Sequence, residues 1–275
     1  MKITSDYHVH CNFSGDSTAT MESMIEQGIA LHLKQICFTD HMDYEYPKQY
    51  LDQGCRFEFN VEEYFDKIEK MNQRYGSEIE ILAGIELGVK PELAERLNQL
   101  VSQYPFDFVI ASSHLLDNYD PYYNDYWEHI QNQSQTGVKR YFQSICENIE
   151  AFSNFDVYGH LDYIVRYVPE QNFLYRPSDY QEEIDRLLQT LIRLGKGIEI
   201  NTAGLKYGLP FAHPKEEIIK RYIQLGGTRI TIGSDAHKPE HLAYDFAYEA
   251  EQLQALGIQE YTIFKQRTPI LCPLN

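Results

Sequence analysis

The chain has 275 residues, of which 43% are hydrophobic and 24% are charged, a balance typical of a globular protein and unlike that of a disordered one. Acidic residues outnumber basic ones by 41 to 24, which gives a formal net charge of −17. This charge repels nucleic acid and anionic membranes, so we expect neither as a partner, whereas carboxylates attract metal ions.

The N-terminus and the cysteines predict a cytoplasmic protein. Met1 leads directly to Asp6 and His8, with no basic segment followed by an apolar one, so we expect neither a signal peptide nor a membrane anchor. The 5 cysteines are an odd number without CxxC spacing, which favours reduced thiols over a disulfide framework or a zinc ribbon. Cys11 lies close to the residues discussed below, where a packed thiol is a more common role than a reactive one.

Short apolar runs alternate with longer segments of helical period, which predicts an α/β fold of parallel strands connected by helices. We expect seven strands, at residues 3–9, 35–39, 79–86, 108–113, 157–161, 197–201 and 229–233. A further run at 261–264 leaves open whether the sheet has seven strands or eight.

Apolar residues at helical spacing predict the connecting segments. The clearest stripe is formed by Met21, Met24, Ile25, Gly28 and Ile29, which follow the i, i+3, i+4, i+7, i+8 spacing. Similar stripes occur at 184–192, 218–223 and 242–250. The segments 43–60 and 115–135 are long, aromatic and weakly periodic, and each follows a predicted strand, so we expect them to be loops that cover a site.

Potential metal ligands stand at the C-terminal ends of six of the seven predicted strands. They are His8 and His10, Asp40 and His41, Glu86, His114, His160 and Asp162, and Asp235 and His237. The strand ends of a parallel barrel converge on one face, so these side chains can meet in one site. Because buried unpaired histidine and aspartate are costly, the repetition predicts a metal site rather than core packing. Imidazole and carboxylate ligands suit zinc, manganese or iron.

Several motifs together resemble a known family. The sequences DYHVH, ICFTDH, AGIELG, SSH, YGHLD and IGSDAH, in this order between residues 6 and 237, resemble the motifs of the polymerase-and-histidinol-phosphatase (PHP) superfamily. The stretches FSGDS, IEINTAG and DNYDPYY are similar to those of its stand-alone histidinol-phosphate phosphatases. The resemblance implies one PHP-type domain over residues 1–275, a distorted (β/α)7 TIM-like barrel with a metal site at the C-terminal strand ends. It also implies hydrolysis of L-histidinol phosphate to L-histidinol and phosphate, a step of histidine biosynthesis.

The resemblance further implies three divalent metal ions. The first would be bound by His8, His10, Glu86 and Asp235, the second by Glu86, His114 and His160, and the third by Asp16, His41 and His237. Glu86 would be catalytic, because two ions bridged by one carboxylate, about 3.5 to 4 Å apart, lower the pKa of a water that attacks phosphorus. For Asp16, a solvated position in a turn is the alternative.

Four further residues are candidates for a direct role. Asp162 follows His160 by two residues and would share its face if the strand continues, so it is either the general acid or a carboxylate that orients a histidine. Arg166 and Lys206 follow the fifth and sixth strands and are expected to bind the substrate phosphate, with surface charge as the alternative. Asp43 is expected to bind the cationic part of the substrate. Aromatic residues of the two long loops would assist it or would simply pack; these are Tyr44, Tyr46, Tyr119, Tyr122 and Tyr123.

Other functions stay open on the sequence alone. A related phosphatase could act on phosphotyrosine or on nucleotides, and a barrel of similar ligands could hydrolyse a C–N bond as deaminases do, although these lack the GSDAH motif. A non-catalytic metal-binding scaffold is the alternative from another class. Degenerate scaffolds usually lose ligands, whereas every strand-end position named above is occupied here.

Overall fold

The computed structural model describes residues 3–51, 56–170 and 173–274. Its main sheet is a nearly closed barrel of seven parallel strands in the order β1-β2-β4-β5-β6-β7-β8. The strands are β1 (Ser5–Val9), β2 (Gln35–Phe38), β4 (Glu80–Gly88), β5 (Phe108–Ser112), β6 (Val157–Tyr158), β7 (Gly197–Asn201) and β8 (Ile230–Gly233). The predicted seven-stranded parallel barrel is therefore confirmed.

Two irregularities shape the mouth of the barrel. The short strand β3 (His41–Met42) pairs with the upper part of β4, beyond the segment that pairs with β2, so β2 and β3 follow one path with a break at residues 39 and 40. Strand β1 meets the segment that follows β8 through a parallel bridge between Val9 and Ala236, and the backbone N–H of His10 donates to the carbonyl of Ala236 at 2.9 Å. The C-terminal strand ends thus form a nearly continuous ring.

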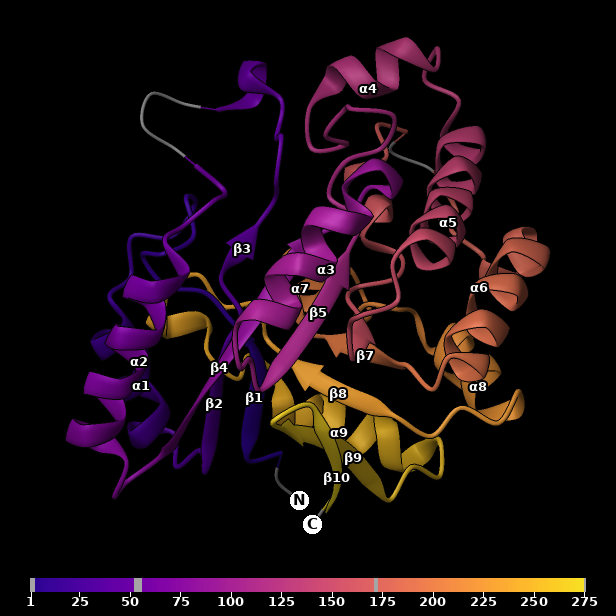
Figure 1. Ribbon diagram of the computed structural model, residues 1–275. Coiled ribbons are helices and arrows are strands. Elements are labelled where there is room, and N and C mark those ends of the chain that lie inside the picture. Colours follow the sequence, from indigo (N-terminus) through magenta and orange to yellow (C-terminus); the bar gives the residue numbers. More distant parts are fainter. Residues whose placement is uncertain (1–2, 52–55, 171–172, 275) are drawn as a thin grey trace.

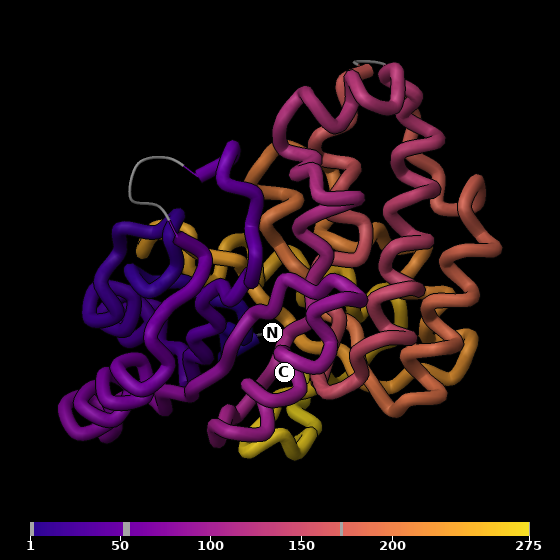
Figure 2. The backbone as a smooth tube through the Cα atoms, turned by 45° about the horizontal axis from the view of Figure 1, so that its top comes forward, coloured from indigo at the N-terminus to yellow at the C-terminus, as the bar shows by residue number. Residues whose placement is uncertain are grey.

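Helices surround the strands (Figures 1 and 2). The α-helices are α1 (Met21–Ala30), α2 (Val61–Tyr75), α3 (Ala94–Gln103), α4 (Asn124–His129), α5 (Ser134–Ala151), α6 (Gln181–Arg193), α7 (Ala203–Lys206), α8 (Glu216–Gln224) and α9 (Phe246–Ala255). Short 3₁₀ helices are η1 (Lys48–Tyr50), η2 (Pro91–Leu93), η3 (Tyr163–Tyr167), η4 (Pro177–Tyr180) and η5 (Pro239–His241). Side-chain caps begin α1 at Thr20 and α2 at Asn60, because each oxygen accepts from free backbone N–H groups of the first turn. Strands β1, β5 and β7 are buried along their whole length, as expected when helices cover a parallel sheet.

The run at 261–264 does not extend the barrel. It forms the core of β9 (Glu260–Lys265), which pairs antiparallel with β10 (Thr268–Pro273) in a separate two-stranded sheet. This hairpin lies at the opposite end of the molecule from α4 (Figure 1). The hydroxyl of Tyr7 donates to the carbonyl of Phe264 at 2.8 Å, and the rings of Phe108 and Phe264 lie 5.1 Å apart. The hairpin therefore packs against strands β1 and β5 of the barrel through the aromatic residue Phe264.

Three other expectations need correction. The fifth strand ends at Tyr158 and not at residue 161. The segment 115–135 contains α4 and the start of α5, so it is partly helical. The last predicted helical stripe, at 242–250, begins too early, because α9 starts at Phe246. Its buried face also differs, since Ala247 is exposed and Glu249 is buried. Within the described ranges, no helix combines the length and the apolar character that crossing a membrane requires.

Candidate metal centre

Glu86 lies at the centre of the site. This residue of β4 is fully buried, and both of its carboxylate oxygens face imidazole nitrogens. Oε1 lies 3.1 Å from Nε2 of His114 and 3.0 Å from Nε2 of His160, while Oε2 lies 3.1 Å from Nε2 of His8 and 3.0 Å from Nδ1 of His41. One carboxylate therefore joins side chains from strands β1 and β3 and from the loops after β5 and β6.

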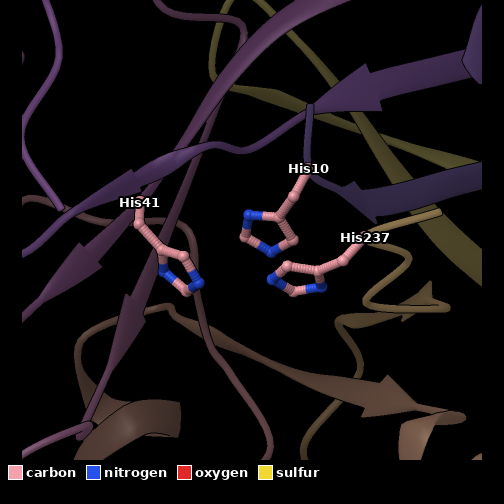
Figure 3. A group of neighbouring side chains, drawn as sticks. All are labelled: His10, His41 and His237. Carbon is pink, nitrogen blue, oxygen red and sulfur yellow. The ribbon is translucent and has the colours of Figure 1, made fainter. Parts of the chain in front are cut away.

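A second part of the site adjoins the first. The rings of His10, His41 and His237 face one another (Figure 3), with His10 stacked on His237 at 4.1 Å and on His41 at 4.3 Å between ring centroids. Oδ1 of Asp235 lies 3.4 Å from Nε2 of His10. Oδ2 of Asp16 lies 3.1 Å from Nε2 of His237 and 3.5 Å from Nε2 of His41, and its side chain is 40% exposed. Asp16 thus stands at the outer rim of the site.

The donor atoms converge as a metal centre requires. Four groups of three have all their donor atoms within 4.8 Å of one another: His8, Glu86 and His160; His41, Glu86 and His114; His8, His10 and Asp235; and His10, His41 and His237. Several buried atoms have no hydrogen-bond partner among the described residues, namely Nε2 of His8, His10 and His237, Nδ1 of His41 and Oε2 of Glu86. Lone pairs that face one another at such distances repel unless a cation or a proton lies between them, so this donor set suits divalent metal ions.

The cluster keeps its carboxylates ionised. Burial by itself raises the pKa of Glu86, but the surrounding imidazoles, His8 first among them, outweigh burial and hold the pKa well below its usual range. Asp235 behaves in the same way, since His8 and its neighbours overcome the effect of burial and lower its pKa. Burial lowers the pKa of His114, yet Asp43 and Glu86 together raise it to about 10. The carboxylates are therefore available as anionic ligands at neutral pH.

Two buried aspartates hold the loops that present the donors. Asp40 accepts hydrogen bonds from the backbone N–H groups of Cys11 and Ser14 at 2.8 and 3.0 Å, which fixes the loop after β1. Asp6 accepts from the backbone N–H of Ser234 at 3.0 Å and from that of Ala243 at 3.0 Å, which fixes the loop after β8. Both aspartates precede histidines of the cluster by one or two residues, so the same strands supply donors and loop anchors.

Cys11 has no sign of reactivity. Its thiol is fully buried and donates to Asp40 at 3.2 Å, and burial, followed by the charge of Asp40, raises its pKa well above the usual value. The thiolate is the nucleophilic form of cysteine, so this environment favours the packed role. Cys11, Cys37, Cys146 and Cys272 are free thiols, and Cys55 lies outside the described residues.

Asp162 was expected to share the face of His160 if the strand continued to residue 162, but the strand ends earlier. Because β6 ends at Tyr158 and His160 has a positive φ of 22°, the alternation of faces is lost before residue 162. Oδ1 of Asp162 lies 2.5 Å from Nδ1 of His213, and Oδ2 accepts from the backbone N–H of Lys215 at 2.8 Å. Both oxygens of Asp162 thus have partners in the segment between α7 and α8, and its role as general acid stays a prediction.

Arg166 and Lys206 both lie against the ring of Tyr207, with the guanidinium carbon 4.2 Å and the ammonium nitrogen 5.0 Å from its centroid. The ammonium of Lys206 donates to the carbonyl of Asp235 at 2.8 Å. The guanidinium of Arg166 stacks over Tyr207 at 4.2 Å and donates to the hydroxyl of Tyr167 at 2.6 Å, while its buried Nη1 has no hydrogen-bond partner among the described residues. The two cations therefore stand on one side of the donor cluster, with one guanidinium nitrogen available.

The first long loop contributes Asp43 to the same region. Oδ2 of Asp43 lies 2.6 Å from Nδ1 of His114, which leaves the Nε2 of that ring to face Glu86. Oδ1 of Asp43 is buried and has no hydrogen-bond partner among the described residues. One oxygen thus orients a histidine, and the other remains for a further contact.

The loop tyrosines differ in where they lie. Tyr46 donates to Asp120, Tyr44 packs under Arg96, Tyr119 stacks on His129, Tyr123 stacks on Tyr50, and Tyr122 contacts Tyr167. Tyr122 is 62% exposed and its ring contact connects the second long loop with the neighbourhood of Arg166. Tyr44 and Tyr119 pack against Arg96 and His129, which are not residues of the donor cluster.

The end of β7, the one strand end at which the sequence predicted no metal ligand, also belongs to the site. Glu199 and Asn201 of β7 are buried, and Oε1 of Glu199 lies 2.5 Å from Nδ1 of His8. The available signal was the alternation of Glu199 and Asn201 with Ile198 and Ile200, which turns two polar side chains to one face of a buried strand.

Comparisons with known proteins identify the family and support the fold. The family model described as "PHP domain" matches residues 6–203. A histidinol-phosphatase of Lactococcus lactis is 32% identical over 237 residues, which cover 84% of this chain and 83% of the relative. The solved structure of histidinol phosphate phosphatase from Lactococcus lactis, complexed with zinc, L-histidinol and phosphate, has a TM-score of 0.86 and 27% identity and covers 97% of this chain and 98% of that one. A solved structure from Listeria monocytogenes, 20% identical with a TM-score of 0.68, covers 89% of this chain and 99% of its own and shows the shared fold.

Proposed function

The chain belongs to the PHP domain family, and we propose that it is a phosphatase that hydrolyses L-histidinol phosphate to L-histidinol and phosphate. The observation that carries this proposal is the convergence of imidazole and carboxylate donors on Glu86, at the strand ends of a barrel that matches the Lactococcus lactis enzyme over 97% of its length. That enzyme was solved with zinc, L-histidinol and phosphate. We assign the protein to the cytoplasm, because the proposed reaction is biosynthetic. We also propose that residues 1–275 form a single domain.

Three divalent ions, zinc, manganese or iron, are assigned to the donor cluster. The first is bound by His8, His10, Glu86 and Asp235, the second by Glu86, His114 and His160, and the third by Asp16, His41 and His237. The short distances from Glu86 to His8 and to His160 support a carboxylate shared by two ions, and the distances from Asp16 support its place with His41 and His237. When bound, the ions supply positive charge that stabilises the phosphoryl oxygens and lowers the pKa of the attacking water.

The remaining residues bind and orient the substrate. Arg166 offers its unpartnered Nη1 to a phosphate oxygen, and Lys206 adds a point charge next to Asp235. Asp43 offers Oδ1 to the cationic part of the substrate. Tyr122, which contacts Tyr167, places an aromatic face near the same cations. The chain thereby holds the phosphate on one side of the donor cluster.

The test is phosphate release from L-histidinol phosphate, compared with a panel of sugar, nucleotide and aryl phosphates including phosphotyrosine. Metal content is measured on the same preparation, and a chelated sample serves as the control. We expect strong selectivity for L-histidinol phosphate and loss of activity on chelation. Metal-dependent activity that favours another ester would overturn the assignment of the substrate but would still support the metal-dependent mechanism. A protein that hydrolyses none of these esters, whatever its metal content, would support a non-catalytic scaffold.

A further inference from the structure

Glu199 connects two residues of the donor cluster that come from different strands. Its side chain is almost completely buried, with 1% of its surface exposed. Oε1 lies 2.5 Å from Nδ1 of His8 on β1. Oε2 accepts from the backbone N–H of His160, after β6, at 3.0 Å and from Nδ2 of Asn201 at 3.2 Å. Both oxygens of this carboxylate are therefore committed to groups that carry or support the cluster.

The contact with His8 crosses an intervening strand. Strand β8 lies between β7 and β1 in the barrel, and it presents Gly233 where the Glu199 carboxylate passes. A Cβ at Gly233 would lie 2.7 Å from Oε1 of Glu199 and would overlap the Cβ of His8. The missing side chain of Gly233 therefore leaves the room through which a carboxylate of β7 reaches β1.

The second contact supports an unusual backbone conformation. His160 has a φ of 22°, which is uncommon for a residue with a side chain and costs of order 1–3 kcal/mol. The hydrogen bond from its N–H to Glu199 helps to hold this conformation, and the ring of His160 then places Nε2 3.0 Å from Oε1 of Glu86. Glu199 therefore acts on the side chain of one donor and on the backbone of another.

We propose that Glu199 is a positioning residue that orients His8 and His160 toward Glu86 and thereby raises the affinity of the centre for divalent metal. The inference rests on the proposed metal assignment, because His8 and His160 are ligands in it. A carboxylate on the Nδ1–H of a ligating histidine fixes the tautomer and the ring orientation and makes the other nitrogen a better donor. In this structure that other nitrogen, Nε2 of His8, lies 3.1 Å from Oε2 of Glu86.

The experiment uses the full chain with the substitution Glu199→Gln. Glutamine has a similar size but carries one acceptor oxygen, so it cannot accept from His8 and from the backbone of His160 at once. We expect zinc to be removed by a competing chelator at a concentration ~10- to 100-fold lower than for the wild type. The kcat for L-histidinol phosphate should fall and recover when excess zinc is added, whereas KM should change little.

Two further variants separate positioning from a general loss of structure. Glu199→Asp keeps the charge on a shorter side chain and is expected to hold zinc with an intermediate affinity. Glu249→Gln replaces another buried glutamate, on α9 outside the cluster, and should leave zinc affinity unchanged. If Glu199→Gln fails to fold, the aspartate variant and the nitrogen NMR spectrum of labelled zinc-loaded wild type, which reports whether Nδ1 of His8 carries the proton, still test the inference.

The possible results distinguish this inference from the proposed function. Zinc affinity in Glu199→Gln equal to that of the wild type, or a spectrum of the zinc-loaded wild type that shows no proton on Nδ1 of His8, would overturn the positioning role even in a fully active phosphatase. A wild type that binds zinc but does not hydrolyse L-histidinol phosphate would overturn the function. In that case, loss of zinc from Glu199→Gln would still support the positioning role.

Discussion

Replacing Glu86 by glutamine removes the charge at the centre of the donor cluster. Its two oxygens lie 3.0 Å from His160 Nε2 and 3.0 Å from His41 Nδ1, so both are engaged. Glutamine can still accept the hydrogen bond that Ser112 donates at 2.7 Å, but it is neutral and has one acceptor oxygen in place of two. If the loss costs about 4 kcal/mol of charge stabilisation in the transition state, kcat/KM falls on the order of 1,000-fold.

The assay is phosphate release from L-histidinol phosphate over a range of metal concentrations, with bound metal quantified and folding followed by circular dichroism. Glu249→Gln is the matched control, because it also neutralises a buried glutamate but lies on α9. We expect Glu86→Gln to fold, to bind less metal and to stay nearly inactive when metal is added. A variant that kept more than about a tenth of the wild-type kcat/KM with a full metal content would refute the bridging role.

Three further predictions follow from single contacts. Asp16 is the most exposed proposed ligand, at 40%, so Asp16→Ala should retain one metal ion fewer per chain by elemental analysis, and a full content would remove Asp16 from the ligand set. Lys206 donates to the Asp235 carbonyl at 2.8 Å; Lys206→Ala should lower kcat/KM roughly 10- to 100-fold. Lys206→Arg should recover most of this loss, and an unchanged alanine variant would argue for surface charge. Burial and a neighbouring glutamate raise the pKa of Glu249 to about 7. The folded protein therefore holds a proton that the unfolded chain releases from about pH 4.3 upward, so the free energy of unfolding falls as the pH rises toward 7. Glu249→Gln should remove up to about 3 kcal/mol of this fall in denaturant titrations at pH 5 and pH 8, and the exposed Glu251→Gln should not.

Much of the fold followed from local patterns. Each of the seven barrel strands was predicted to within a few residues at either end, because runs such as FVIAS of β5 and GIEIN of β7 are buried on both faces. The run at 261–264 was ambiguous because a short apolar segment has no property that distinguishes a barrel strand from a hairpin strand. Its pairing with β10 is local, across the turn at residues 266–267, whereas the packing of this hairpin against Tyr7 and Phe108 depends on tertiary structure.

The site was predictable in residue type and less so in arrangement. Strand ends of a parallel barrel meet on one face, so histidines and carboxylates at those positions were expected to lie together, and the structure brings His8, Glu86 and His160 within one group. Asp162 was placed by strand parity, which fails because β6 is two residues long. The alternation of side chains between two faces can therefore be used to place a residue only while it lies within the strand.

The sequence by itself determined the order of strands and helices, the acidic character of the chain and the residues available as metal donors at six strand ends. Tertiary structure decided which donors share Glu86, that Asp162 turns to His213 and that Glu199 reaches His8 past Gly233. The physical reason is that buried residues recur at the period of a helix or strand, so the sequence shows where these elements lie. Contacts between strands depend instead on how the barrel closes and on the room that a glycine leaves on a neighbouring strand.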